Sequence, residues 1–554
     1  MKLTLRSLVV LLALSASLSA VQPLKISADL KDKKDNGPVE VIVQLAGTAS
    51  SSDQDKVKAL GGLIKRLHRT VDGMTISLPA SRIEKLSDDP NVRYITPNRK
   101  VGRMLDTAVS TVNGDLARSW GYTGEGIAVA VIDSGVTPVN DLNGRNASRV
   151  VYSESFVGGA ATDGYGHGTH VAGIIAGDGD DSLFLGIRRL TGVAPAAKIV
   201  SLKALDDDGS GDDSTVLAAL DRVLALKSLY NIRVVNLSLG RRIYESYASD
   251  PLCRAVENLW KAGIVVVVAA GNNGRDNSMG TKGYGTINSP ANDPYVITVG
   301  AMKDNGTTWR SDDTIASYSA KGPTQIDHVA KPDIVAPGNR IVSLLSSPTE
   351  RLALDYPSNR VPVSYYKLDL TKALSNSYFT MSGTSMATPM VSGAAALLLQ
   401  KEPALTPDQV KARLMKTSYK SFPFSSIAVE PTTGEQFVSY YDIFTVGAGY
   451  LDIAAALSSA EVAQGSAASP IVTLNASTNT VSMVMPAGVV WGSGVVWGTG
   501  VIWGSGVVWG TGVVWGSGVV WGTSNPQGTG VVWGTGVVWG SSEMVAENTV
   551  VGEN

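Results

Sequence analysis

Three short glycine-rich segments of the chain carry side chains that could together perform nucleophilic catalysis. They are Val131-Ile132-Asp133-Ser134-Gly135, Gly166-His167-Gly168-Thr169-His170-Val171-Ala172-Gly173 and Gly383-Thr384-Ser385-Met386-Ala387-Thr388-Pro389. A serine hydroxyl is a weak nucleophile at neutral pH and needs an adjacent base. An imidazole, whose unperturbed pKa is about 6.5, can act as that base, and a buried carboxylate can hold its tautomer and stabilise its cation. Asp133, His167 and Ser385 supply these groups in that order along the chain.

Each of these residues also has a purely structural explanation when it is considered alone. Asp133 could be a turn residue at the end of a strand. His167 and His170 are three residues apart and could bind a metal from one helix face, although no Glu or Cys near them completes a ligand set. Ser385 could be a helix N-cap. The combination of segments therefore carries more weight than any one of them.

A fourth segment, Gly271-Asn272-Asn273-Gly274, follows the apolar run 264–270. An Asn-Gly pair could simply form a turn with positive φ. Alternatively, the side chain of Asn272 could donate an N–H to the oxyanion of a tetrahedral intermediate. Asp133, Asn272 and the segment 238–240 each follow an expected strand. Because ligands of open α/β sheets bind outside the carboxyl ends of the strands, we expect these residues to lie close together.

The elements that would position these residues are apolar strands and amphipathic helices, which alternate from about residue 124 to residue 457. The expected strands are the Val/Ile-rich runs 127–132, 199–203, 233–237, 264–270 and 295–299, and the expected helices are 214–226, 252–261 and 410–416. Continuous apolar strands separated by helices favour a mostly parallel sheet that is covered on both faces. Cys253, in one of these helices, is interpreted as an inert core residue.

The N-terminal part of the chain predicts export and a separate module. Residues 1–20 are typical of a secretory signal peptide, because Lys2 and Arg6 precede an apolar core and a small-residue cleavage region. The apolar core is too short to span roughly 30 Å of hydrocarbon, which argues against a membrane anchor. Residues 38–101 predict a compact α+β module in the order β-α-β-α-β, with a helix over 53–68. The basic segment 98–106 is a candidate cleaved linker.

The C-terminal tail, residues 465–554, differs in composition from the rest of the chain. No charged residue occurs between Glu461 and Glu543, and Gly-Val-Val-Trp-Gly-Ser/Thr repeats place a Trp at every sixth position from 491 to 521 and again at 533 and 539. A fixed short period is typical of a solenoid or of stacked hairpins. Two Gly in every six residues would also suit a flexible linker. The sequence leaves both interpretations open.

The composition excludes some classes of function. The 47 Lys and Arg against 49 Asp and Glu give a net charge of −2, and without a long basic run the chain is not expected to bind nucleic acid. A single cysteine excludes an intramolecular disulfide and a multi-cysteine zinc site. Apolar residues make up 44% of the chain, which is enough for a large core.

The chain resembles the subtilases, the secreted subtilisin-like serine proteases, in motifs that follow one another in the order Asp, His, Ser. The resemblance runs from the signal region to about Leu457 and rests on Asp133-Ser134-Gly135, His167-Gly168-Thr169-His170 and Gly383-Thr384-Ser385-Met386-Ala387. It implies that Asp133 orients the imidazole, that His167 acts as general base and then acid, and that Ser385 is the acyl nucleophile. It further implies that Asn272 and the Ser385 backbone N–H stabilise the oxyanion, and that His170 is structural.

The same resemblance implies the domain organisation. We expect a subtilisin-like three-layer α/β fold at 107–460, a small α+β propeptide domain at 38–101 and the repetitive Gly/Val/Trp tail at 465–554. The propeptide would act as an intramolecular inhibitor until the enzyme removes it. Peptide substrates would pair as a β-strand between two extended edges. The implied substrate-binding residues are Gly209, Ser210, Gly211, Ser238, Leu239, Gly240 and Gly271.

The chemistry requires no cofactor and no catalytic metal, although subtilases often bind structural calcium. Asp178, Asp180 and Asp181 lack the spacing of a calcium-ligand loop, and we interpret them as an acidic surface loop. Met390 follows Pro389 where the family usually has His. The segment between Gly338 and Ser385 is longer than in compact members, so residues 341–379 are expected to form a surface excursion near the cleft.

Three functions are compatible with these features. The leading one is a monomeric serine endopeptidase, extracellular or attached to the cell surface, that acts on peptides and proteins through an acyl-enzyme. A second is a surface-attachment protein whose Trp rows stack on sugars or pack on a partner. With either function, the tail is expected to bind a cell surface or a polysaccharide. A third is a hydrolase for esters only, which would share the same triad.

Overall fold

The computed structural model describes residues 25–27, 30, 37–68, 72–97, 107–144, 147–369, 371–430, 433–475, 480–484, 507–509, 513–515, 544–546 and 553. The chain divides into two compact units, residues 1–102 and 103–554. The predicted signal peptide at 1–20, the candidate linker at 98–106 and most of the Trp repeats lie outside the described residues.

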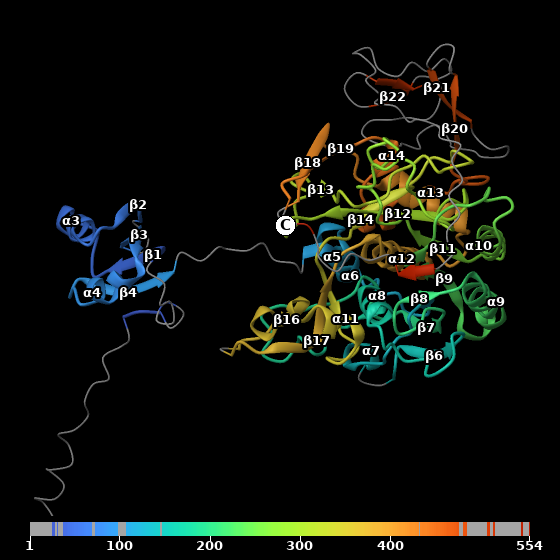
Figure 1. Ribbon diagram of the computed structural model, residues 1–554. Coiled ribbons are helices and arrows are strands. Elements are labelled where there is room, and N and C mark those ends of the chain that lie inside the picture. The colour runs from blue at the N-terminus through green and yellow to red at the C-terminus, as the bar shows by residue number, and fades with distance from the viewer. Residues whose placement is uncertain are drawn as a thin grey trace, which may run out of the picture. The chain divides into compact units, whose positions relative to one another are not determined.

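The first unit is an antiparallel sheet with two helices (Figure 1). Its elements are β1 (Pro38–Leu45), α3 (Ser51–Ala59), β2 (Leu63–His68), β3 (Gly73–Pro79), η1 (Ala80–Arg82), α4 (Ile83–Ser87) and β4 (Val92–Pro97). The strand order is β2-β3-β1-β4. A buried cluster joins the sheet to the helices and includes Val41, Val43, Val57, Ile76 and Leu86.

The predicted helix over 53–68 is wrong in its second half. α3 ends at Ala59, and Gly61 has a φ of +80°, a left-handed conformation that ends a helix. β2 then pairs antiparallel with β3, so the order is β-α-β-β-α-β rather than β-α-β-α-β. Most residues of β2 are exposed, so its sequence lacks the alternation that identifies a half-buried strand.

A mostly parallel sheet of eight strands, counted over the described residues, forms the centre of the second unit. Its order is β13 (Thr314–Ile315), β12 (Ile297–Lys303), β11 (Val265–Ala269), β9 (Ile232–Leu237), β5 (Ala128–Asp133), β7 (Lys198–Lys203) and β6 (Val150–Ser155), and β14 (Ile334–Pro337) also pairs with β12. β13 alone among them pairs antiparallel with its neighbour. All five strands predicted from the sequence lie in this sheet.

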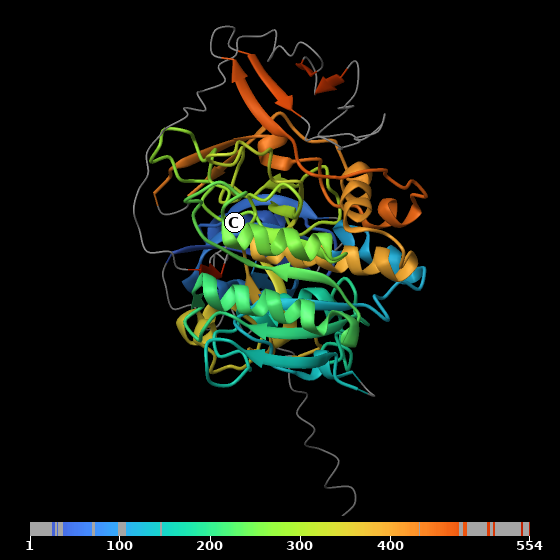
Figure 2. The ribbon, with the colours of Figure 1, turned by 90° about the vertical axis from the view of Figure 1, so that its right-hand side faces the viewer.

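Two layers of helices cover the sheet. α8 (His167–Ala176) and α12 (Thr384–Lys401) pack together on one face, while α9 (Asp213–Tyr230) and α10 (Pro251–Lys261) cover the other, which is turned to the viewer in Figure 2. Strands such as β5 and β11 are buried throughout, which explains their continuous apolar sequences. The predicted α/β fold class is confirmed. The remaining helices are α5 (Ala108–Thr111), α6 (Gly114–Ser119), α7 (Asn140–Asn143), α13 (Pro407–Thr417), α14 (Ile443–Val446) and α15 (Ile453–Ser458).

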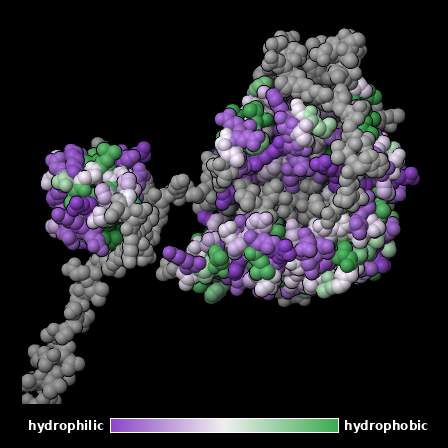
Figure 3. All heavy atoms as spheres, viewed as in Figure 1, coloured by the Kyte–Doolittle hydropathy of each residue, from purple (hydrophilic) through white to green (hydrophobic). Residues whose placement is uncertain are grey.

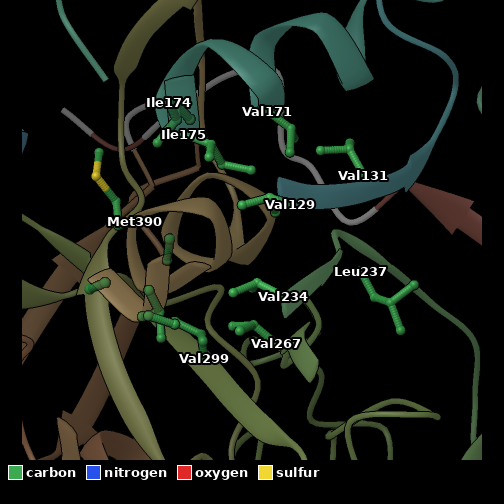
Figure 4. Packing of buried hydrophobic residues seen from close by; sticks show 14 of the residues in the cluster. Val129, Val131, Val171, Ile174, Ile175, Val234, Leu237, Val267, Val299 and Met390 are labelled. Atoms are coloured by element: carbon green, nitrogen blue, oxygen red, sulfur yellow. The ribbon is translucent and has the colours of Figure 1, made fainter. Parts of the chain in front are cut away.

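The main core lies between the sheet and the layer formed by α8 and α12 (Figure 4). Val171 and Ile175 of α8 point toward Val129 and Val131 of β5 in this view. Met390 of α12 belongs to the same cluster and is 1% exposed. One close-packed core therefore fixes both helices against the sheet.

The segment 341–379 is more than the surface excursion that the sequence predicts. β15 (Ile341–Leu344) and β17 (Leu374–Met381) pair antiparallel, and η3 (Pro357–Asn359), β16 (Arg360–Pro362), η4 (Val363–Tyr365) and α11 (Arg351–Asp355) lie between them. Ile341 and Phe379 are buried in the core, and β15 packs on α8. The prediction missed this because the pairing of the two ends of an insertion leaves no local pattern.

Three hairpins and the strand β24, which pairs with β8 and β10, follow the main sheet toward the C-terminus among the described residues. They are β18 (Ser425–Val429) with β19 (Gln436–Tyr440), β20 (Ile471–Asn475) with β21 (Thr480–Val484), β22 (Val507–Trp509) with β23 (Val513–Trp515), and β24 (Met544–Ala546). β22 and β23 lie in two consecutive repeats and pair antiparallel. Ser469 is buried in the second unit, with its Oγ 2.5 Å from Asp333 Oδ1.

Hydrophilic residues predominate among the coloured residues on the face seen in Figure 3. Within the described ranges, no helix combines the length and the hydropathy that crossing a membrane requires.

Truncating a core side chain should destabilise the second unit. Leu237 of β9 is 0% exposed, and Leu237→Ala should lower the free energy of unfolding by about 2–5 kcal/mol because it leaves a cavity. Urea unfolding followed by circular dichroism measures this change. The control is Leu229→Ala, at a side chain that is 72% exposed, which should change stability by less than about 0.5 kcal/mol. Equal effects at the two positions would contradict the assignment of the core.

Candidate active site

The candidate site lies at the carboxyl edge of the parallel sheet. Asp133 is the last residue of β5, Ser238 follows β9, and Gly271 lies just beyond β11. Because β5, β9 and β11 are parallel neighbours, their carboxyl ends meet at one edge. α8 and α12 both begin at this edge, because His167 at the start of α8 contacts Asp133 and Thr384 at the start of α12 contacts Asn272.

Asp133 and His167 are in direct contact. The His167 Nδ1 atom lies 2.7 Å from Asp133 Oδ1, and both side chains are 0% exposed. The backbone N–H of Ser134 donates to the same carboxylate oxygen at 2.8 Å. A proton on Nδ1 leaves the lone pair of the neutral imidazole on Nε2, which has no hydrogen-bond partner among the described residues. The pair therefore presents an oriented base.

A second buried carboxylate, Asp163, holds the start of α8. It accepts hydrogen bonds from the N–H groups of Gly166 and Thr169, each at 2.7 Å, and from the Ser134 hydroxyl at 2.9 Å. Burial raises the pKa of Asp163, although these backbone hydrogen bonds act to lower it. A carboxylate is favourable at a helix N-terminus, where the backbone N–H groups are unpaired. Asp163 thus fixes the first turn of α8, which contains His167.

Gly168 permits the close approach of α8 to the end of β5. A Cβ atom at this position would lie 2.1 Å from the carbonyl oxygen of Gly135 and 3.1 Å from Asp133 Cβ. Any side chain here would push the first turn of α8 away from β5 and would lengthen the contact between His167 and Asp133.

Ser385 lies in the first turn of α12 and is 0% exposed. Its hydroxyl donates to the carbonyl oxygen of Ser238 at 3.0 Å, and the Ser238 hydroxyl donates to the carbonyl oxygen of Ser385, also at 3.0 Å. In this conformation the Ser385 hydroxyl is directed at Ser238 rather than at His167. A serine hydroxyl changes direction by rotation about one bond, without movement of the helix.

The side-chain amide of Asn272 is oriented by the residue that precedes Ser385. The N–H of Thr384 donates to Asn272 Oδ1 at 3.0 Å, and the N–H of Gly271 donates to the Thr384 hydroxyl at 3.2 Å. Because Oδ1 faces Thr384, the NH2 group of Asn272 is turned the other way. These contacts tie the end of β11 to the start of α12, so Asn272 and Ser385 are held in neighbouring positions.

Two short strands, β8 (Ser210–Gly211) and β10 (Leu239–Gly240), contain four of the seven residues that were predicted to bind substrate. Ser238 directly precedes β10, and Gly209 directly precedes β8. Gly209 has a φ of +79°, and a Cβ atom there would lie 2.5 Å from the Tyr165 ring. The predicted edges are therefore extended, and both pair with β24 in one three-stranded sheet.

His170 does not belong to the group around Asp133. Its Nε2 atom lies 3.2 Å from the carbonyl oxygens of both Ile341 and Phe379. Burial lowers the pKa of His170 to about 3, so the ring is neutral at physiological pH. His170 connects α8 to β15 and β17, which supports a structural role.

Carboxylates of the acidic loop after α8 make polar contacts within the protein. Asp178 pairs with Arg149 at 2.9 Å, and Asp181 Oδ1 accepts a hydrogen bond from Asn140 at 3.0 Å. These carboxylates are therefore used within the protein. Across the ranges that the structure describes, no group of three or more His, Cys, Asp or Glu side chains could hold a metal ion.

Sequence reasoning missed two buried acids near His167. Asp163 had a usable signal, because an acid just before an expected helix start is typical of a cap. Glu350 had none, since it lies in the distant segment 341–379. Its carboxylate accepts from the N–H groups of Ser346 and Ser347 at 2.9 and 3.1 Å, and burial raises its pKa to about 9.

Comparison with known proteins agrees with this geometry. Residues 124–441 match the family described as the subtilase family. The chain is 39% identical over 351 residues to "Serine protease AprX" of Bacillus subtilis (strain 168), which covers 61% of this chain and 71% of that protein. It is 32% identical over 378 residues to "Subtilisin E" of the same strain, covering 68% and 82%. It is also 32% identical over 360 residues to "Alkaline protease" of Shouchella clausii, covering 64% and 77%.

Neutralising Glu350 should stabilise the protein at alkaline pH. Because the pKa of Glu350 is raised to about 9 in the folded state, the folded state keeps a proton that the unfolded state releases above its ordinary pKa of about 4.3. The stability contributed by this group is therefore lost as pH rises through that window. We expect Glu350→Gln to raise Tm by at least about 2 °C at pH 8 and to have little effect at pH 4.

The control for this prediction is Glu245→Gln, at an exposed position. Thermal unfolding of both variants and the parent protein is compared across the pH range. A Glu350→Gln protein with the same pH dependence as its parent would contradict the burial of a protonated carboxyl at this position.

Proposed function

Because the chain belongs to the subtilase family, we propose that Ser385 is the acyl nucleophile of this serine endopeptidase, with His167 and Asp133 as its base and orienting acid. The observation that carries the proposal is the 2.7 Å contact between Asp133 and a His167 whose Nε2 atom has no hydrogen-bond partner among the described residues. An imidazole held in this way has its basic nitrogen available for the hydroxyl of a nearby serine.

In the first step, the Ser385 hydroxyl leaves Ser238 and transfers its proton to His167 Nε2 as the oxygen attacks the scissile carbonyl. Asp133 stabilises the imidazolium that forms, because its Oδ1 atom accepts from Nδ1. The imidazolium then protonates the leaving amine, and the acyl-enzyme remains on Ser385. Water attacks the ester in the second half of the reaction, with His167 acting again as base and then as acid.

The oxyanion that forms from the carbonyl oxygen is stabilised by the Asn272 amide and the Ser385 backbone N–H. Asn272 Oδ1 accepts from the N–H of Thr384, which orients the side-chain amide, and its NH2 group carries the N–H donors. Ser385 lies in the first turn of α12, where backbone N–H groups lack intrahelical partners and the helix dipole favours negative charge.

Substrate is bound as an extended peptide between β8 and β10. Both strands are short and already accept a third strand in antiparallel pairing. Backbone hydrogen bonds of this kind do not depend on side-chain identity, so broad specificity follows. Ser238 contacts Ser385 directly, and Gly271 contacts Thr384, the residue before Ser385.

We further infer that the protein is made as a secreted zymogen. Residues 1–20 carry the signal-peptide pattern, and the first compact unit, whose described part folds as a small β-α-β-β-α-β domain, would be the inhibitory propeptide. Parallel sheets are rich in non-local contacts and fold slowly, which gives a folding helper a physical purpose.

Replacing the proposed nucleophile tests the function directly. Ser385→Ala should lower kcat on casein by about 10⁶-fold, as loss of the nucleophile does in subtilisin. The precursor should then retain residues 38–101, which intact mass and N-terminal sequencing would reveal. A serine-directed phosphonylating reagent should label Ser385 in the parent protein. Normal processing and full activity of the variant would overturn the proposal.

Replacing the oxyanion donor should impair turnover more than binding. Asn272→Leu removes the N–H donor, and we expect kcat to fall about 10²–10³-fold with little change in KM, as for the corresponding donor of subtilisin. Steady-state kinetics on a chromogenic peptide separate the two constants. A matched control is Asn273→Leu, at the adjacent residue. A large rise in KM with kcat unchanged would assign Asn272 to ground-state binding instead.

The two rival functions predict different substrates and different roles for the tail. An enzyme restricted to esters would cleave a small ester but leave casein intact. An attachment protein would lose surface retention, and not peptidase activity, when the repeats are removed. Because Ser469 and its neighbours are packed in the second unit, the informative truncation starts at residue 485. We expect the truncated protein to retain peptidase activity, measured on casein.

A further inference from the structure

The C-terminal end of the chain lies in the cleft that we assign to substrate. β24 is the central strand of the order β10-β24-β8, so it occupies the space between the two predicted substrate edges (Figure 1). Met544 pairs with Gly211, and Val545 pairs with Ser210 on one side and Gly240 on the other. Ala546 pairs with Leu239. All of this pairing is antiparallel, and an extended segment added to sheet edges in this way is a common mode of peptide binding.

The register directs a peptide in this position toward the proposed nucleophile. Successive residues of β24 pair with Gly240 and then with Leu239. A peptide that continued in this register would next pass Ser238, whose carbonyl oxygen lies 3.0 Å from the Ser385 hydroxyl. The direction of β24 is therefore that of a substrate whose scissile bond follows shortly after the paired residues.

A second contact holds Glu553, the next-to-last residue of the chain. Its Oε1 atom accepts from the Ser317 N–H at 2.9 Å and from Arg275 Nη2 at 2.8 Å, and it also contacts the Ser317 hydroxyl. The side chain of Asn339 binds the backbone of Glu553. Its Nδ2 atom donates to Glu553 O at 3.0 Å, and its Oδ1 atom accepts from the Glu553 N–H at 2.9 Å. The side chain of Glu553 is 8% exposed.

Arg275 of this carboxylate site also makes contacts that do not involve Glu553. Arg275 is held by a hydrogen bond from its Nε to the Ser317 hydroxyl at 2.7 Å and by an ion pair with Glu430 at 3.0 Å. The Arg275 guanidinium also lies over the Phe437 ring, 4.6 Å from its centroid. An arginine fixed in this way loses little freedom when it binds a carboxylate.

The Glu553 site lies beside the loop that leads into Ser385. Asn339 follows Gly338, whose carbonyl oxygen accepts from the N–H of Gly383 at 2.8 Å. β24 pairs with Leu239, next to the Ser238 that contacts Ser385, and Glu553 contacts Asn339, next to the Gly338 that binds Gly383. Both contacts are therefore one residue away from partners of the start of α12. Ser385 and His167 are both 0% exposed with β24 in place.

We propose that Met544–Ala546 and Glu553 act as a built-in ligand of the active-site cleft, which competes with peptide substrates. This proposal rests on the assignment of β8 and β10 as the substrate edges. Backbone pairing supplies the affinity at β24, and the cluster formed by Arg275, Ser317 and Asn339 recognises the acidic residue at position 553. A tethered ligand has an effective concentration of about millimolar, so even a weak intrinsic affinity suffices for occupancy.

Kinetics of two variants test the proposal. Removal of residues 544–554 should lower the apparent KM for a small chromogenic peptide by at least about 5-fold with kcat nearly unchanged, because the competitor is absent. Glu553→Gln should produce a smaller decrease in KM, since the charge recognised by Arg275 is lost. Glu543→Gln, which alters the acid immediately before β24, is the matched control and should leave KM unchanged. Equal KM values for the parent and the truncated protein would overturn the proposal.

A binding experiment separates this proposal from the proposed function. A labelled peptide of residues 541–554 should bind the truncated protein carrying Ser385→Ala, measured by fluorescence anisotropy without any turnover. Unlabelled peptide should inhibit the active truncated enzyme competitively, and a peptide with Glu553→Gln should do so more weakly. Failure of the peptide to bind, while Ser385→Ala still abolishes hydrolysis, would reject the ligand and leave the endopeptidase assignment intact. Release of inhibition on dilution of the full chain would assign the ligand to a second copy and overturn the intramolecular form.

Discussion

The contact between Asp133 and His167 constrains most of the second unit, because it joins the end of a strand to the start of a helix. Burying a carboxylate and an imidazole is costly unless they are paired, and here both are 0% exposed and 2.7 Å apart. The pair can form only if α8 approaches β5 closely, which the absence of a side chain at Gly168 permits. Asp163 then fixes the direction of the first helical turn. The packing of α8 on β5 is thus a requirement of the chemistry as much as of stability.

A second helix, α12, positions Ser385 at the same carboxyl edge of the sheet. α12 packs against α8 and the sheet, while Thr384, next to Ser385, is hydrogen-bonded to both Gly271 and Asn272 beyond β11. The segment 341–379 supports this arrangement. Carbonyl oxygens at its two ends accept hydrogen bonds from His170, and Glu350, in its middle, lies against Gly166 in the loop before His167. Residues far apart in the chain are therefore positioned by one core and by a few buried polar contacts.

The sequence was informative wherever function demands particular residues at particular strand ends. The five central strands and the α/β class follow from continuous Val/Ile runs, and the motifs around Asp133, His167 and Ser385 pointed to the family that the comparisons then showed. The sequence was less informative where an element is defined by a distant partner. β2 is an exposed edge strand and looked like the end of a helix, and the ends of segment 341–379 looked like a surface loop.

The two buried acids show the same limit of prediction from sequence, because a distant partner can define them. Asp163 precedes its helix by a few residues and could have been found, whereas Glu350 acquires its raised pKa only because folding brings it against the loop before His167. The pairing of β24 with β8 and β10 also lies beyond local pattern, since Met544–Ala546 carries no motif and its partners lie some 300 residues earlier in the chain.

The three-stranded sheet formed by β8, β24 and β10 has a consequence for how copies of the molecule behave toward one another. An unpaired strand edge invites any extended chain to add to it, and in a protease such a chain is then cut. With β24 in place, the facing edges of β8 and β10 are already satisfied within the molecule. On our proposal that β8 and β10 are the substrate edges, a neighbouring copy meets no unpaired edge there, and we expect concentrated enzyme to resist autolysis for as long as Met544–Ala546 stays paired.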